Sequence, residues 1–253
     1  MRDNKTKAKL YSDQPVYGVV VRFPSPTLVE MFGFLGFDFI MLDSEHGSLN
    51  LQGVEELLRA AELSDTTSVL RIPFLQAKEI SRALDIGVQG IQVPNVNTIH
   101  DARAIVHAAK FSPEGERGMA LGRGANYGMT FEWAEYLSWS NKNTLLIAHI
   151  ESLEAVKNLP EIVTCGDLDV LFVGPADLSQ SMGLPGQLNH PEVLRMVEKV
   201  VSTIRQAGKI AGVYASNAPA IKRFKDMGCQ YLLISADNLI RQVGREYLAA
   251  VRA

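Results

Sequence analysis

The sequence predicts a single α/β domain folded as a (β/α)8 TIM barrel. Eight short apolar runs have the length of buried strands, and eight parallel strands close such a barrel. Amphipathic stretches with helical spacing separate most of these runs, so we expect right-handed crossover connections. The length of 253 residues and the hydrophobic content of 47% suit one globular domain. We therefore expect one domain over residues 1–253, with residues 1–14 as a polar N-terminal extension.

The expected strands are apolar runs bounded by turn residues, as is typical of parallel strands buried on both faces. In chain order they are residues 16–21, 37–42, 68–72, 90–93, 144–150, 170–173, 210–215 and 231–235. Parallel α/β folds place their chemistry at the carboxyl ends of the strands. The residues that follow each run are therefore the candidates for a site.

The expected helices lie between these runs. Residues 51–63 carry Val54, Leu57, Leu58 and Ala61 at helical spacing. Helix starts are predicted at Ser25-Pro26 and at residues 189–192, where a capping residue precedes proline. Helix ends are predicted near Gly36, Gly87, Gly208 and Gly228. Residues 112–127 form a long irregular loop, which is usually functional or mobile, and residues 238–251 form the final helix.

The composition excludes several classes of partner. A formal net charge of −3 and a pI near 6.0 provide no basic footprint for nucleic acid or an anionic membrane, which favours a small-molecule partner. Cys165 and Cys229 lack metal-binding or disulfide-scaffold spacing and are expected to be buried, reduced thiols. The first ten residues lack a secretory apolar stretch, and no run approaches the roughly 20 apolar residues of a membrane span. We expect a cytoplasmic protein.

The first candidate site segment follows the second expected strand. Asp43, Glu45 and His46 place three ionisable groups within four residues, and charged groups are rarely buried without partners. Histidine titrates near neutral pH, so His46 is a candidate base. The alternative is a solvated turn in which Glu45 begins a helix.

Arg71 lies at the end of the third expected strand and therefore at the same rim. A guanidinium there can hold a carboxylate with two hydrogen bonds or stabilise a developing oxyanion. A structural ion pair with Asp43 or Glu45 is an equally good interpretation of the same position.

Two further carboxylates follow neighbouring strands. Glu151 comes directly after the fifth expected strand, and Asp177 comes four residues after the sixth. Together with water and substrate oxygens they would suit Mg²⁺, Mn²⁺ or a similar ion. The alternatives are a general acid and base pair of the glycosidase kind, or carboxylates favoured at helix N-termini. His149 shares a strand face with Glu151 and is expected to face the barrel mouth.

Other motifs are weaker. Residues 122–128 do not fit the GxGxxG pattern and follow no strand, so a dinucleotide site is rejected. His100 and His107 fall in a helical stretch and are expected at the surface or in packing.

Six motifs that occur in order between residues 16 and 235 carry a family resemblance. They are Leu42-Asp43-Ser44-Glu45-His46-Gly47, Leu70-Arg71-Ile72-Pro73, Leu84-Asp85-Ile86-Gly87, Gly115-Glu116-Arg117-Gly118, Ile150-Glu151-Ser152 and residues 172–179 with the sequence FVGPADLS. Together they resemble the class II pyruvate aldolases of the 4-hydroxy-2-oxoheptanedioate and 2-dehydro-3-deoxyglucarate aldolase family.

The resemblance implies a metal-dependent aldolase that cleaves a 4-hydroxy-2-oxo acid to pyruvate, or a similar 2-oxo acid, and an aldehyde. It implies Mg²⁺, Mn²⁺ or Co²⁺ without a Schiff-base lysine, and a homohexamer of dimers that exchange their C-terminal helices. The implied roles are metal ligation by Glu151 and Asp177, proton acceptance by His46, transition-state stabilisation by Arg71, an increase in His46 basicity by Asp85, and substrate contacts from His149, Gly174, Ala176 and Asp177.

Two features of the chain depart from this pattern. The family commonly has glutamine where this chain has His149, two residues before the metal-binding glutamate. The residue pattern also places Asp85 near a helix C-terminus, so its role is implied by the resemblance alone. Two other functions stay open: a lyase acting on acyl-CoA esters, which needs a basic patch for the CoA phosphates, and a non-catalytic protein that binds oxo acids.

Overall fold

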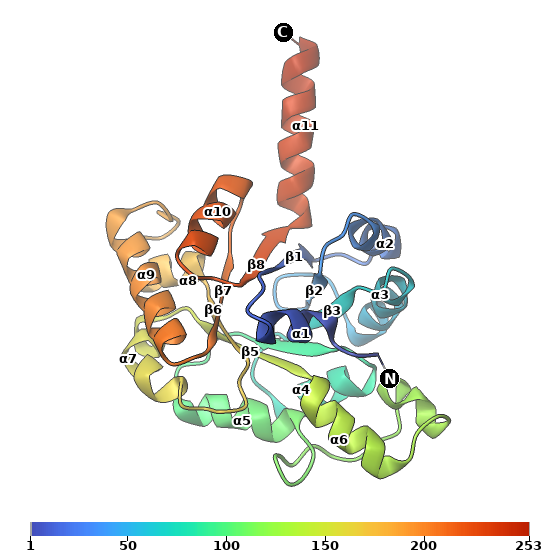
Figure 1. Ribbon diagram of the computed structural model, residues 1–253. Coiled ribbons are helices and arrows are strands. Elements are labelled where there is room, and N and C mark those ends of the chain that lie inside the picture. Colours follow the sequence, from blue (N-terminus) through green and yellow to red (C-terminus); the bar gives the residue numbers. More distant parts are fainter. Residues whose placement is uncertain (1, 253) are drawn as a thin grey trace.

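The computed structural model describes residues 2–252 and contains a closed barrel of eight parallel strands, in which β8 pairs with β1 (Figure 1). The strands are β1 Val16–Val21, β2 Phe39–Asp43, β3 Thr67–Arg71, β4 Gly90–Val93, β5 Leu145–Ile150, β6 Val170–Val173, β7 Ile210–Tyr214 and β8 Tyr231–Ser235. The predicted TIM barrel is confirmed. The expected strand ends differ from these bounds by at most two residues.

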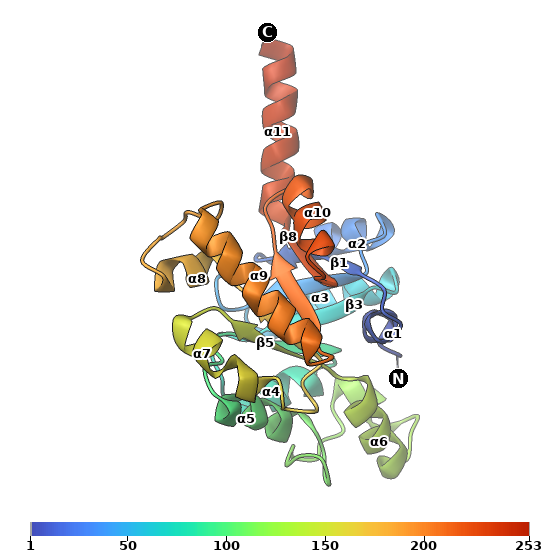
Figure 2. The same ribbon diagram turned by 60° about the vertical axis from the view of Figure 1, so that its left-hand side comes forward.

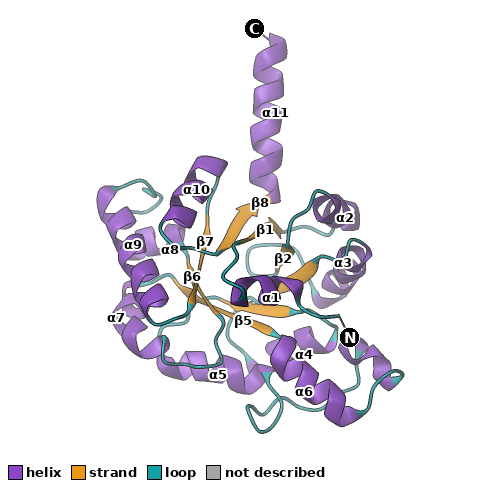
Figure 3. Cartoon of the chain, viewed as in Figure 1, coloured by secondary structure: helices purple, strands orange, loops and turns teal. Residues whose placement is uncertain are grey.

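The helices surround the barrel, as Figures 2 and 3 show. They are α1 Lys5–Tyr11, α2 Pro26–Phe34, α3 Leu51–Leu63, α4 Ala77–Asp85, α5 Ile99–Ala109, α6 Trp133–Asn143, α7 Leu153–Ile162, α8 Pro175–Ser181, α9 Pro191–Gln206, α10 Ala218–Asp226 and α11 Ala236–Arg252, with a short 3₁₀ segment, η1, at Arg123–Gly128. The predicted cap is confirmed at α2, where the Ser25 side chain accepts a hydrogen bond from the Leu28 amide. The four glycines expected at helix ends all have positive φ.

The barrel interior is filled by an aromatic layer beneath the carboxyl ends of the strands. The rings of Phe39 and Tyr231 stack with centroids 4.3 Å apart, and Phe172 packs edge-on against Tyr231 at 6.0 Å. Gly18 makes room for this layer, because a Cβ at that position would lie 2.2 Å from the Phe39 ring. The floor of the barrel mouth is therefore close-packed, which favours a single arrangement of the side chains above it.

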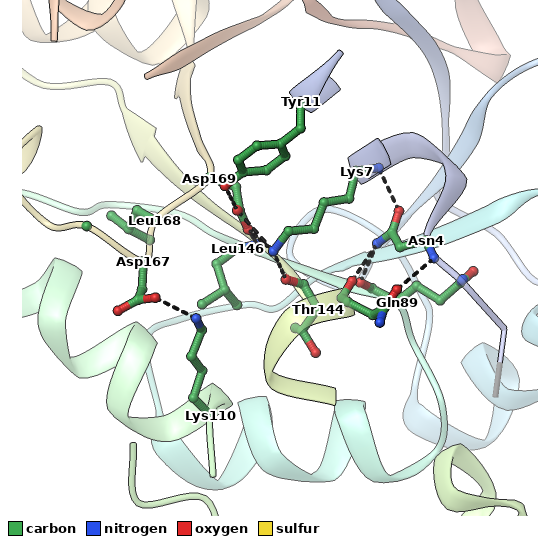
Figure 4. Close-up of polar contacts among 12 residues, drawn as sticks. Asn4, Lys7, Tyr11, Gln89, Lys110, Thr144, Leu146, Asp167, Leu168 and Asp169 are labelled. Carbon is green, nitrogen blue, oxygen red and sulfur yellow. Dashed lines mark hydrogen bonds and ion pairs between the residues drawn. The ribbon is translucent and has the colours of Figure 1, made fainter. Parts of the chain in front are cut away.

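Helix α1, part of the expected N-terminal extension, packs across the amino-terminal end of the barrel (Figure 4). The buried Asp169 carboxylate pairs with Lys7 Nζ at 3.0 Å and accepts a hydrogen bond from the Tyr11 hydroxyl at 2.5 Å. Asn4 Nδ2 donates to the carbonyl oxygens of Gln89 and Asn143, which precede β4 and β5. This end of the barrel is therefore covered, and the opposite end is the open one.

Helix α11 projects away from the barrel, beyond the other helices (Figure 1). Its exposed apolar side chains Ile240, Val243, Tyr247 and Val251 recur at helical spacing. The final helix expected over residues 238–251 is confirmed, with slightly wider bounds.

None of the helices over residues 2–252 combines the length and the hydropathy needed to cross a membrane. The cytoplasmic location expected from the sequence stays a prediction.

Candidate active site

A cavity of about 330 Å³ opens at the carboxyl ends of the barrel strands. Seven of the eight side chains and backbone positions expected in the site line it: His46, Arg71, His149, Glu151, Gly174, Ala176 and Asp177. Its apolar wall includes Val20, Met41, Phe172 and Leu233. A concave apolar pocket with a few convergent polar groups is the usual form of a small-molecule site.

Glu151, directly after β5, is the most constrained carboxylate in the cavity. Its Oε2 accepts a hydrogen bond from His149 Nδ1 at 2.7 Å, and its Oε1 accepts one from the Asn95 amide at 2.8 Å. Burial alone would raise the pKa of Glu151, but the interaction with His149, the Asn95 amide and the charge of Arg71 together lower it. The carboxylate is therefore held ionised at neutral pH.

Gly174, the residue after β6, makes room for that carboxylate. A Cβ at residue 174 would lie 2.7 Å from Glu151 Oε2, which is closer than real Cβ contacts allow. Glycine at this position therefore permits the close approach of Glu151 to the start of α8.

Asp177 lies in the first turn of α8 and is exposed toward the same cavity. Among residues 2–252, no hydrogen bond or salt bridge engages its carboxylate. The donor set of Glu151 and Asp177 consists of two carboxylates with free lone pairs, which fits a hard divalent cation that takes its other ligands from water and substrate oxygens. No group of three or more His, Cys, Asp or Glu side chains in this part of the chain forms an all-protein metal cage.

Arg71, the last residue of β3, both lines the cavity and makes the ion pairs that the alternative interpretation predicted. Its Nε and Nη2 donate to the two oxygens of Asp43 at 2.9 and 2.6 Å, and its Nη1 lies 3.0 Å from Glu45 Oε2. Burial alone would lower the pKa of Arg71, but these carboxylates outweigh burial and raise it. The guanidinium is therefore held charged in one orientation.

Asp43 is buried with partners and anchors the loop that follows β2, so its charge is explained by structure. Its side chain is fully buried and accepts hydrogen bonds from Arg71, from Arg22 Nε at 3.1 Å and from the amides of Glu45 and His46. The Asp43 carboxylate thus has its hydrogen-bond partners inside the protein. Asp43 fixes the course of residues 43–46 and so places His46 at the rim.

His46 itself is exposed, with Nε2 3.8 Å from Glu45 Oε2. Among the described residues, no hydrogen bond or ion pair links Asp85 to His46. Asp85 is the last residue of α4, outside the cavity, and its carboxylate accepts a hydrogen bond from Arg117 Nη2 at 2.7 Å. The role of Asp85 toward His46 stays a prediction from the resemblance.

Several residues of the cavity, and Tyr231 in the aromatic layer, were not predicted from the sequence. Gln92 in β4 reaches His149, and Tyr231 at the start of β8 reaches Gln92. A glutamine inside the otherwise apolar run GIQV was the available signal. Arg223 also lines the cavity. Its Nη2 donates to Asn189 Oδ1 at 3.3 Å, and its buried Nε has no hydrogen-bond partner among the described residues.

Comparison with known proteins adds four findings. A model of the HpcH/HpaI aldolase/citrate lyase family matches residues 17–235. A 4-hydroxy-2-oxo-heptane-1,7-dioate aldolase from Shigella sonnei is 33% identical over 250 residues, which cover 98% of this chain and 94% of that protein. Among solved structures, an HpcH/HpaI aldolase/citrate lyase family protein from Burkholderia cenocepacia superposes with a TM-score of 0.93 at 31% identity, covering 99% of this chain and 100% of the other. An HpcH/HpaI aldolase from Desulfitobacterium hafniense gives 0.92 at 26% identity, covering 97% and 96%.

Proposed function

We propose a reaction for this chain, which belongs to the HpcH/HpaI aldolase/citrate lyase family and is a carbon–carbon lyase. The proposed reaction is the reversible cleavage of a 4-hydroxy-2-oxo acid to an aldehyde and pyruvate, or a similar 2-oxo acid. One observation carries this proposal: Glu151, Asp177, Arg71 and His46 line the same cavity, although they come from four separate segments of the chain. Two carboxylates can hold a cation, a guanidinium can stabilise an oxyanion and an imidazole can accept a proton, which are the roles that this cleavage uses.

We propose that Glu151 and Asp177 hold a divalent cation, Mg²⁺, Mn²⁺ or Co²⁺. The fit rests on the donor set, on the glycine that admits the Glu151 carboxylate and on the lack of internal partners for Asp177 among the described residues. When bound, such an ion supplies positive charge to the carboxylate and 2-oxo oxygens of the substrate. Gly174 and Ala176 line the cavity and precede Asp177 in the sequence. They are the proposed backbone contacts of the oxo acid.

Arg71 stabilises the oxyanion in this proposal. A guanidinium has five N–H donors: Nε and Nη2 each donate one to Asp43, while Nη1 forms an ion pair with Glu45. The others are available to the 2-oxo oxygen of the substrate, where negative charge develops as the C3–C4 bond breaks. Because its carboxylate partners already fix the guanidinium, little reorganisation is required during the reaction.

His46 is the proposed acceptor of the 4-hydroxyl proton, either directly or through a water molecule. The electrons of the broken C3–C4 bond form the enolate of the 2-oxo acid, which takes a proton from water at C3 to complete the product. The exposed position of His46 on the rim suits a group that exchanges its proton with solvent after each turnover. The loop that carries His46 is held by the amide hydrogen bonds to Asp43.

Pyruvate release is the direct test of this function. Purified protein with Mn²⁺ is expected to release pyruvate from some members of a panel of 4-hydroxy-2-oxo acids of varied chain length, detected by a coupled assay. Dialysis against a chelator is expected to abolish the activity, and Mg²⁺, Mn²⁺ or Co²⁺ to restore it. Full activity of the chelated protein would contradict the proposed metal dependence. Calorimetric binding of pyruvate without turnover of any substrate would favour the non-catalytic alternative.

Arg223 suggests how the aldehyde is chosen. It lines the cavity together with Asn189 and Asn217, and its Nε has no hydrogen-bond partner among residues 2–252. We expect Arg223→Met to lower kcat/KM about 10- to 100-fold for a substrate whose aldehyde fragment carries a distal carboxylate, because one charge-assisted hydrogen bond is lost. A neutral aldehyde of equal length serves as the control. An equal loss of kcat/KM with both substrates would show that Arg223 does not select the aldehyde.

We further propose a homohexamer built from dimers that exchange their C-terminal helices. The support is the exposed apolar face of α11, formed by Ile240, Val243, Tyr247 and Val251, on a helix that projects from the barrel (Figure 2). A second copy of the chain would remove this face from water.

A further inference from the structure

We propose that His149, Gln92 and Tyr231 form a buried hydrogen-bond relay that positions the Glu151 carboxylate, and that His149 is a positioning residue and not a substrate contact. This inference rests on the proposed function, because the purpose assigned to the relay is to hold Glu151 for its cation. It assigns a role to the histidine that replaces the glutamine common in similar sequences.

The relay crosses the interior of the barrel from β8 to the end of β5. The Tyr231 hydroxyl donates to Gln92 Oε1 at 3.0 Å, and Gln92 Nε2 lies 2.7 Å from His149 Nε2. His149 Nδ1 lies 2.7 Å from Glu151 Oε2. Each link has ordinary hydrogen-bond length, so the four side chains form one continuous chain of contacts.

The direction of each hydrogen bond follows from the Tyr231 end. Tyr231 Oη has no other hydrogen-bond partner within the described residues, so its proton goes to Gln92 Oε1. Gln92 then presents its NH₂ group to His149, whose Nε2 must be the acceptor. The single ring proton of His149 therefore sits on Nδ1 and is donated to Glu151. The contacts with Gln92 and Glu151 are therefore sufficient to select this tautomer.

Both nitrogens of His149 are consequently occupied, so neither remains for a substrate. Glu151 Oε2 keeps a lone pair that points away from His149, and Oε1 is fixed separately by the Asn95 amide. Asn95 donates from a left-handed backbone conformation with φ of 55°, which asparagine tolerates better than most residues. The carboxylate is thus held at both oxygens, and the Glu151 side chain lines the cavity.

Packing prevents the relay from rearranging. The exposed fraction of His149 is 1%, and Gln92 and Tyr231 are fully buried. The His149 ring stacks on Phe172 with centroids 4.7 Å apart and an interplanar angle of 28°. A ring flip would break both hydrogen bonds inside an apolar layer, where unpaired polar groups are costly. Removal of a hydrogen-bond partner of a metal-binding side chain typically lowers metal affinity 10- to 100-fold.

Metal titration of the intact protein tests the relay without measuring catalysis. His149→Phe keeps the stacking on Phe172 but removes both nitrogens, and we expect the dissociation constant for Mn²⁺ to rise about 10- to 100-fold. His149→Gln restores one acceptor and one donor and is expected to bind within a few-fold of the parent. Tyr231→Phe removes only the hydroxyl that orients Gln92 and is expected to weaken binding about fivefold. Tyr136→Phe, a buried tyrosine in another cluster, is the matched control and should bind Mn²⁺ like the parent.

The tautomer provides an independent measurement. Nitrogen NMR of metal-free protein labelled at its five histidines, with His149 assigned from the His149→Gln variant, is expected to show a proton on Nδ1 and none on Nε2. A proton on Nε2 would overturn the relay but not the metal site. If the parent binds Mn²⁺, equally tight binding by His149→Phe would have the same meaning. A parent that binds no Mn²⁺ would overturn the proposed metal site and this role of the relay together.

Discussion

Arg71→Ala is expected to lower kcat for cleavage on the order of 10² to 10³-fold, the effect typical of removing one oxyanion donor. The physical reason is that Arg71 lines the cavity and carboxylates hold its guanidinium on two sides, at Asp43 and at Glu45. The dissociation constant for Mn²⁺ is expected to change far less, because the proposed metal ligands are untouched. Steady-state kinetics and metal titration of the same preparation measure both quantities.

Arg71→Lys is the matched control for this variant. Lysine keeps a positive charge near Asp43 but cannot reproduce the two parallel hydrogen bonds, so we expect an intermediate kcat. Thermal unfolding of each variant shows whether lost activity reflects lost structure. A kcat for Arg71→Ala equal to that of the parent would remove Arg71 from the mechanism.

Asp43→Asn is expected to lower the free energy of unfolding by about 3 kcal/mol, at the lower end of the range for breaking a buried ion pair. The substitution keeps the shape of the side chain but leaves the buried Arg71 guanidinium facing a neutral amide, with Glu45 as its remaining carboxylate partner. Denaturant titration at neutral pH measures the change. Glu55→Gln, which breaks the exposed pair with Arg59 on α3, is the matched control and should cost less than about 0.5 kcal/mol.

The effect of Asp43→Asn should also depend on pH in one direction. Burial alone would raise the pKa of Asp43, but the Arg71 hydrogen bonds and charge, with the loop amides and Arg22, lower it. A carboxyl whose pKa is lower in the folded state stabilises the fold above its unfolded value, near 3.9, and this contribution is lost as the pH falls toward the folded value. The difference between parent and variant should therefore shrink below about pH 4. A difference that stays constant or widens there would contradict the assigned role of Asp43.

The barrel could be predicted from the sequence because its strands are buried on both faces. Runs such as Val170–Val173 are continuously apolar and are bounded by turn or polar residues. For the same reason Glu151, Asp177 and Arg71 could be assigned to one rim, since parallel strands bring their carboxyl ends together. Position along the strand was thus sufficient for these side chains.

The partners of those side chains could not be predicted in the same way. Tyr231 and Gln92 are separated by 139 residues, and their hydrogen bond depends on which side chains the closed barrel turns inward. Asp43 was ambiguous for another reason. A carboxylate at the end of a strand suits chemistry and an internal ion pair equally well, and only the distances to Arg71 and Arg22 decide between them.

A crystal structure of the protein with Mn²⁺ and pyruvate tests the central claim most directly, because the anomalous signal of Mn²⁺ locates the ion independently of the protein atoms. The predicted result is one ion bound by the carboxylates of Glu151 and Asp177, with pyruvate on the ion and its 2-oxo oxygen facing Arg71. Mn²⁺ bound elsewhere on the chain, or pyruvate outside this cavity, would contradict the account.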